Sequence, residues 1–76
     1  MTPRLPTLKP RDLIRVLKRA GFEIDHQTGS HIVMHRLTDN CRVVVPWHNR
    51  DLGRSLTFQI LKTAGLTRDD VITLLD

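Results

Sequence analysis

The central stretch of the chain, residues 22–46, reads FEIDHQTGSHIVMHRLTDNCRVVVP. Phe22, Ile24 and His26 alternate with acidic and amide residues, and this two-residue period predicts a half-buried first strand. The Thr-Gly-Ser segment that follows is rich in turn residues and is expected to end that strand. Residues 31–36, which include β-branched residues and no helix cap, predict a second strand beyond the turn.

A third strand is expected from Cys41 to Val45, after the turn residues Thr38-Asp39-Asn40. Pro46 has no amide hydrogen to donate and is expected to stop the ladder of this strand. Three short strands joined by tight turns predict an antiparallel meander.

A helix is predicted before the meander, in residues 10–20, where the apolar residues repeat at helical spacing. Pro10 suits the first helical position, because the amide hydrogen it lacks would have no partner there. Gly21 can adopt the left-handed conformation that ends a helix, and Phe22 is then expected to pack on Leu17.

A second helix is expected from about Ser55, as its N-cap, to Ala64, with Gly65 ending it in the same way. Its apolar stripe is predicted to consist of Leu56, Ile60, Leu61 and Ala64. A short last helix follows, with Thr67 as its cap and Asp70 in position for a capping box.

This order predicts an α+β domain, α-β-β-β-α with a short C-terminal helix. Its three-stranded antiparallel sheet is expected to be covered by helices on one face, which leaves the other face to solvent or a partner. Seventy-six residues provide for one small domain. Residues 1–9 are expected to form a loosely held arm, and residues 10–76 the domain itself.

Several classes of function are excluded by composition. The single cysteine, Cys41, excludes a disulfide framework and a cysteine-based zinc site, and we expect no metal and no small-molecule cofactor. The nucleotide-binding motifs GxxxxGKS/T and GxGxxG are absent. The longest apolar run, residues 43–47, is far shorter than the roughly 20 residues that span a bilayer. We therefore expect a cytoplasmic protein without a membrane partner.

Positive charge is concentrated at the start of the chain. The chain has a net charge of +4, and residues 1–20 hold six basic residues and one acidic residue. A basic first helix suits a polyanion such as nucleic acid, although a solvated helix face has the same composition. The candidate phosphate contacts are Lys18, Arg36, Arg42, Arg54 and Lys62.

A histidine directly follows a predicted turn in the string Gly29-Ser30-His31. The glycine permits close approach of a phosphate, and the serine can donate a hydrogen bond to it. His31, on the side of its strand that faces away from the helices, can act as a general base on a ribose 2′-hydroxyl. His26 and His35 are interpreted as surface histidines without a function.

A second candidate pair, Trp47-His48, follows Pro46 at the end of the third strand. Trp47 either packs over the sheet edge or offers a surface on which a base can stack. His48 is a weak candidate for the group that returns a proton to the leaving oxygen.

Four segments together resemble the HicA family of toxins. PRDLIRVLKRAGF, residues 10–22, looks like the opening helix of the family, and residues 29–31 match its Gly-Ser-His motif. VVVPWH, residues 43–48, resembles its hydrophobic-Pro-x-His stretch, and ILKTAGL, residues 60–66, resembles its closing segment. The segments occur in the family's order over residues 9–75.

The resemblance implies the toxin half of a type II toxin–antitoxin pair, with a fold like that of double-stranded-RNA-binding domains. It implies an mRNA interferase whose catalytic histidine is His31 and whose partner is a HicB-type antitoxin that covers the active site. The chain departs from the family pattern at Arg54-Ser55-Leu56, where a Pro-Gly-Thr type start of the second helix is frequent. It departs again at Asn49-Arg50-Asp51, where a basic or glycine-rich segment is frequent.

The residues and the resemblance together predict a metal-independent endoribonuclease that cleaves mRNA, with His31 as the general base. Two alternatives remain open. The first is a double-stranded-RNA-binding module without catalysis, and the second is a protein-interaction domain that never meets RNA.

Overall fold

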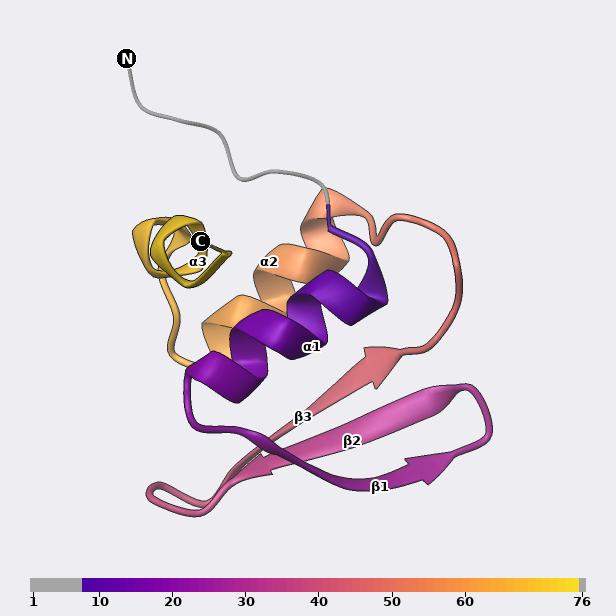
Figure 1. Cartoon of the computed structure of the whole chain (residues 1–76), viewed down its shortest axis with the longest axis horizontal. Coiled ribbons are helices and arrows are strands. Elements are labelled where there is room, and N and C mark those ends of the chain that lie inside the picture. The colour runs from indigo at the N-terminus through magenta and orange to yellow at the C-terminus, as the bar shows by residue number, and fades with distance from the viewer. Residues whose placement is uncertain (1–7, 76) are drawn as a thin grey trace.

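The structure, a computed structural model, describes residues 8–75 as a three-stranded sheet with three helices (Figure 1). In chain order the elements are α1 Pro10–Arg19, β1 Glu23–Thr28, β2 His31–Arg36, β3 Cys41–Pro46, α2 Arg54–Thr63 and α3 Arg68–Leu75. The strands pair antiparallel in the order β1-β2-β3. The predicted α+β class and the meander are therefore confirmed, and the arrangement is like that of double-stranded-RNA-binding domains.

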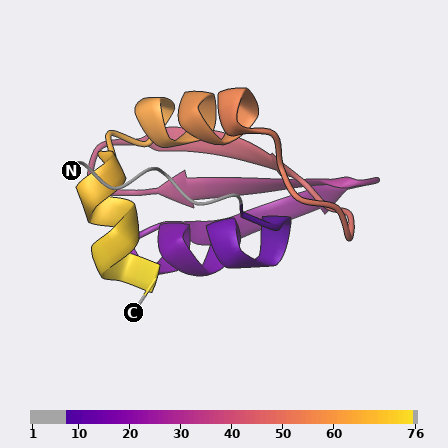
Figure 2. The same cartoon turned by 90° about the horizontal axis from the view of Figure 1, so that it is seen from above.

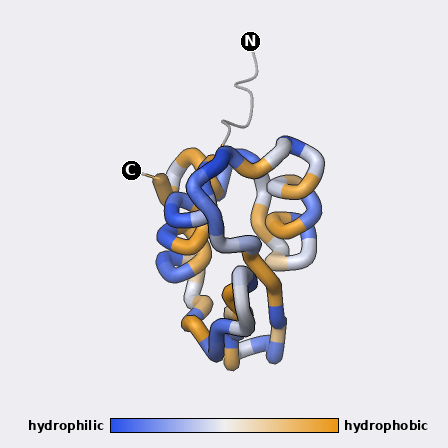
Figure 3. The backbone as a smooth tube through the Cα atoms, turned by 90° about the vertical axis from the view of Figure 1, so that its right-hand side faces the viewer, coloured by the Kyte–Doolittle hydropathy of each residue, from blue (hydrophilic) through white to orange (hydrophobic). Residues whose placement is uncertain are grey.

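Both long helices lie on the same face of the sheet, and the other face is uncovered (Figure 1). Figure 2 shows α1 and α2 side by side, with α3 crossing one end of the pair. The core fills the space between helices and sheet and includes Leu13, Val16, Leu17, Met34, Val45, Leu61 and Val71. Figure 3 shows apolar and polar residues interspersed along the helices, as one-sided burial requires.

The two long helices end by the same device, as predicted. Gly21 has a φ of 98°, and the amide of Phe22 donates to the Leu17 carbonyl at 2.9 Å. Helix α2 ends around Gly65, whose φ is 75°, with an equivalent bond of 2.9 Å from the following amide. A positive φ favours glycine because it has no Cβ, and the bond satisfies a carbonyl at the helix end.

Helix α3 begins with the predicted capping box. The amide of Thr67 donates to the Asp70 carboxylate at 2.9 Å, and the amide of Asp70 donates to the Thr67 hydroxyl at 3.1 Å. The bond from the Thr67 amide lowers the pKa of Asp70 below its ordinary value, because it stabilises the ionised carboxylate.

Strand β1 differs from the half-buried strand that was predicted, because all six of its residues are exposed. Only Phe22, which precedes the strand, reaches the core. The helices pack against β3, at the opposite edge of the sheet, so nothing covers Ile24. The register also shifts between Ile24 and His26, and this β-bulge breaks the expected alternation.

Helix α2 starts two residues earlier than predicted. Gly53 is its N-cap in place of Ser55, and no side chain caps the helix. Thr57 is buried, whereas Leu56, which was expected in the apolar stripe, is more than a third exposed. The Thr57 hydroxyl has no hydrogen-bond partner among the described residues.

The domain includes two residues that were assigned to the N-terminal arm, Leu8 and Lys9, the second of which is the N-cap of α1. Residues 1–7 lie outside the described residues, but Leu8 is buried in the core. The Leu52 amide donates to the Leu8 carbonyl at 2.7 Å, in an isolated antiparallel bridge. Leu8 and Lys9 therefore belong to the folded domain rather than to a loosely held arm.

Candidate active site

The turn between β1 and β2 presents His31 at one end of the sheet. The turn consists of Gly29 and Ser30, since Thr28 pairs with His31. Gly29 has a φ of 56°, a conformation that residues with a side chain rarely adopt. His31 is exposed and Ile32, the next residue, is buried, so His31 projects from the uncovered face as predicted.

The end of β3 lies beside this turn. Pro46 pairs with His31, and the amide of Trp47 donates to the Ser30 carbonyl at 2.6 Å. Pro46 is thus the last paired residue of β3, one residue beyond the predicted end of the strand at Val45. The Gly-Ser-His motif and the Trp-His pair therefore meet at one end of the sheet, although His31 and Trp47 are 16 residues apart in sequence. Trp47 itself is 44% exposed, as a stacking surface must be.

A cavity of about 350 Å³ lies between the segment after β3 and the start of α1. It is lined by Lys9, Arg11, Trp47, His48 and Asn49. Two cations beside an exposed indole suit a phosphate and a base of single-stranded nucleic acid. Lys9 and Arg11 were not among the predicted contacts, although the basic charge of residues 1–20 pointed to this part of the chain.

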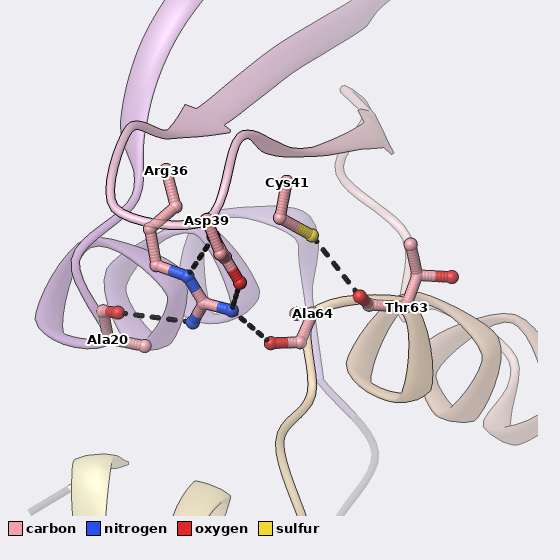
Figure 4. Close-up of polar contacts among 6 residues, drawn as sticks. All are labelled: Ala20, Arg36, Asp39, Cys41, Thr63 and Ala64. Atoms are coloured by element: carbon pink, nitrogen blue, oxygen red, sulfur yellow. Dashed lines mark hydrogen bonds and ion pairs between the residues drawn. The ribbon is translucent and has the colours of Figure 1, made fainter.

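Arg36 is a structural residue rather than a phosphate contact (Figure 4). Its side chain is only 18% exposed and donates to both oxygens of the Asp39 carboxylate, at 2.9 and 2.6 Å. It also donates to the carbonyl of Ala64 at 2.9 Å and to that of Ala20 at 3.5 Å. The guanidinium lies 4.6 Å from the centre of the Phe22 ring. Arg36 thereby joins the C-terminal ends of α1 and α2.

The other predicted basic contacts do not gather around His31. Lys18 is exposed on α1, and this helix covers the face of the sheet opposite to the one that carries His31. Arg54 and Lys62 lie on α2, beside an apolar groove of about 630 Å³ that the exposed Phe58 also lines. All three side chains are exposed, and none of them lines the cavity beside Trp47.

The uncovered face carries a polar network that sequence reasoning missed. One oxygen of Asp25 is 2.7 Å from His26 Nδ1 and 3.1 Å from Arg42 Nη1. The pair with Arg42 crosses the middle strand, because Asp25 is on β1 and Arg42 on β3. The hydrogen bond from His26, and then the one from Arg42, lower the pKa of Asp25 below its ordinary value.

Two further searches concern the described residues as a whole. Within residues 8–75, no three His, Cys, Asp or Glu side chains gather as ligands for a metal ion. No helix in the same part of the chain has the length and apolar character needed to cross a membrane.

The fold and the site define a small basic α+β domain with an exposed histidine after a Gly-Ser turn. The family model described as the HicA toxin of bacterial toxin-antitoxin matches residues 10–66. The chain therefore belongs to the HicA toxin family, as the four sequence segments predicted. It is the toxin of a toxin–antitoxin system, which implies a cognate antitoxin. No curated protein matches the chain.

Proposed function

We propose that this toxin is a metal-independent endoribonuclease that cleaves mRNA, with His31 as the general base. The observation that carries the proposal is the 2.6 Å hydrogen bond from the Trp47 amide to the Ser30 carbonyl. It brings an exposed histidine, a Gly-Ser turn and an exposed indole to one end of the sheet. A positioned imidazole needs no metal to accept a proton from a hydroxyl.

In the proposed reaction, His31 removes the proton from a ribose 2′-hydroxyl, whose oxygen attacks the adjacent phosphorus. The turn at Gly29 and Ser30 contacts the phosphate that is attacked. Base catalysis of this kind contributes about 10²–10⁴-fold to the rate. The neighbouring nucleotide stacks on Trp47, and Lys9 and Arg11 contact its phosphates.

The proposal extends to the partner and the compartment. A HicB-type antitoxin covers the end of the sheet that holds His31, and the toxin meets its mRNA substrate in the cytoplasm. An acidic surface on the antitoxin competes with RNA for the same cations, Lys9 and Arg11.

The test is RNA cleavage by His31→Ala, with His35→Ala as the matched control. Both histidines lie on the uncovered face of β2. His35 is near the opposite end of the strand from His31, and its Nε2 is 2.7 Å from Asn40 Oδ1. We expect His31→Ala to lose cleavage and growth arrest while RNA binding is retained, and His35→Ala to keep all three.

Three outcomes contradict the proposal in different ways. Cleavage by His31→Ala at the wild-type rate removes His31 from the mechanism. Salt-dependent RNA binding by a wild-type protein that cleaves nothing favours the non-catalytic RNA-binding alternative. RNA affinity that is absent, or flat with salt concentration, favours the protein-interaction alternative.

A further inference from the structure

Two histidines project from the uncovered face within one diagonal step of each other. His26 of β1 pairs with Val33 of β2, and Thr28 pairs with His31, so all four side chains share that face. Diagonal neighbours in an antiparallel sheet are about 7–8 Å apart. At this separation one phosphodiester can contact both imidazole rings, each through a hydrogen bond of about 2.6–3.2 Å.

The ring of His26 is oriented by a carboxylate. Its Nδ1 is 2.7 Å from Asp25 Oδ2, and Arg42 holds the same oxygen at 3.1 Å. An ionised carboxylate accepts only, so Nδ1 of His26 carries the proton that they share. The carboxylate also stabilises the positive charge of a ring that is about to donate a proton, and Nε2 is left free to do so. The His26 side chain is 54% exposed, which leaves that nitrogen open to a substrate.

His48, the earlier candidate for the proton donor, is placed differently. Its Nδ1 accepts the amide hydrogen of Arg50 at 3.1 Å, so this nitrogen is occupied by a backbone contact within its own loop. The ring lines its cavity together with Lys9 and Arg11, and among the described residues this lining includes no carboxylate that could orient it as Asp25 orients His26. His48 is therefore suited to contact RNA rather than to donate the proton.

We infer that His26 is the general acid of RNA cleavage and that Asp25 is its positioning residue, an inference that rests on the proposed function. His31 removes the 2′-hydroxyl proton while the 2′-oxygen bonds to phosphorus. The bond from phosphorus to the 5′-oxygen breaks, its electron pair goes to that oxygen, and His26 Nε2 protonates it. The products are a 2′,3′-cyclic phosphate and a 5′-hydroxyl. Proton exchange with water then restores both rings.

The test uses two versions of one RNA, with oxygen or with sulfur as the bridging 5′-atom at the mapped cleavage site. A thiolate leaves without a proton donor, because a thiol is a much stronger acid than an alcohol. We expect His26→Ala to cleave the oxygen substrate about 10²–10⁴-fold more slowly than wild type. The same variant should cleave the sulfur substrate at close to the wild-type rate. His31→Ala should lose both reactions, because each needs the base.

Asp25→Asn tests the positioning role. We expect this variant to cleave the oxygen substrate more slowly than wild type, but with a smaller loss of rate than His26→Ala. It should cleave the sulfur substrate at close to the wild-type rate. A residue that only supports the fold would slow both reactions equally. His35→Ala, on the same face, should change neither rate. Each comparison is a ratio between two substrates of one protein sample, so a change in folded fraction cancels.

Several results overturn the inference. Cleavage of the oxygen substrate by His26→Ala at the wild-type rate overturns it, and so does an equal slowing of this variant on both substrates. If His48→Ala, and not His26→Ala, is slow on the oxygen substrate but cleaves the sulfur substrate at close to the wild-type rate, the general acid is His48. A wild-type protein that cleaves neither substrate overturns the proposed function itself, which is a different result from any of these.

Discussion

Neighbouring residues of β2 face two different environments. Ile32 and Met34 are buried beneath α1 and α2, whereas His31 projects from the uncovered face. The covered face has apolar side chains, and the uncovered face has the charged network of Asp25 and Arg42. A sheet with helices on one side only can thus separate stability from chemistry. Substitutions on the covered face should cost folding free energy, whereas those at Asp25, His26 and His31 on the uncovered face should mainly cost activity.

The largest effect is expected for Met34→Ala. Met34 is fully buried at the centre of the covered face, and removing its side chain leaves a cavity. Such a change lowers the free energy of unfolding by about 2–5 kcal/mol, a large fraction of the stability of a small domain. Urea denaturation measures it, with Val33→Ala, on the other face of the same strand, as the control. A loss of the same size in Val33→Ala would contradict the division between the faces.

Arg36→Ala is expected to have the second largest effect. This side chain leaves the sheet and donates to the carbonyls that end α1 and α2, so removing it leaves both without that partner. We expect a loss of about 2 kcal/mol in the free energy of unfolding, again measured with urea. Arg42→Ala removes an arginine from the uncovered face and should leave the melting temperature nearly unchanged. Equal losses in the two variants would show that Arg36 has no special structural role.

Thr57→Val should stabilise the protein. The Thr57 hydroxyl is buried under α2 without a hydrogen-bond partner among the described residues, and valine has nearly the same shape. Replacing a buried, unpaired hydroxyl with a methyl group is expected to add about 1 kcal/mol to the free energy of unfolding. The control is Thr63→Val, which removes a hydroxyl that donates to the Gln59 carbonyl at 3.0 Å. A loss of stability in Thr57→Val would mean that its hydroxyl is paired after all.

The covered face could be predicted from the sequence, because burial imposes a period of two on Ile32 and Met34 and a helical period on α1. His31 could be predicted because its motif is local: a turn and the residue after it. The pair of Asp25 and His26 could not, since a β-bulge places two consecutive residues on one face and leaves no periodic signal.

Arg36 was misassigned for a related reason. Its partners Ala20 and Ala64 are 16 and 28 residues away, so only the packing of two helix ends reveals its role. Lys9 and Arg11 were missed because their cavity forms where the start of α1 meets Trp47. In each case the missing information is a contact between distant segments, which composition and periodicity do not contain.

Asp25→Asn should have the smallest effect on stability and gives the sharpest comparison of the two faces. The pKa of Asp25 is lowered, first by His26 and then by Arg42, so its ionised form favours the folded state. Wild type should therefore be slightly more stable than Asp25→Asn above the ordinary carboxyl value of 3.8. The difference should vanish as the pH falls through the lowered pKa, because both side chains are then uncharged. Melting temperatures at pH 7 and at pH values near 2–3 measure it, and a difference that grows toward acid pH would contradict the assigned sign. Cleavage of the oxygen substrate at pH 7 should fall in the same variant, although its stability hardly changes.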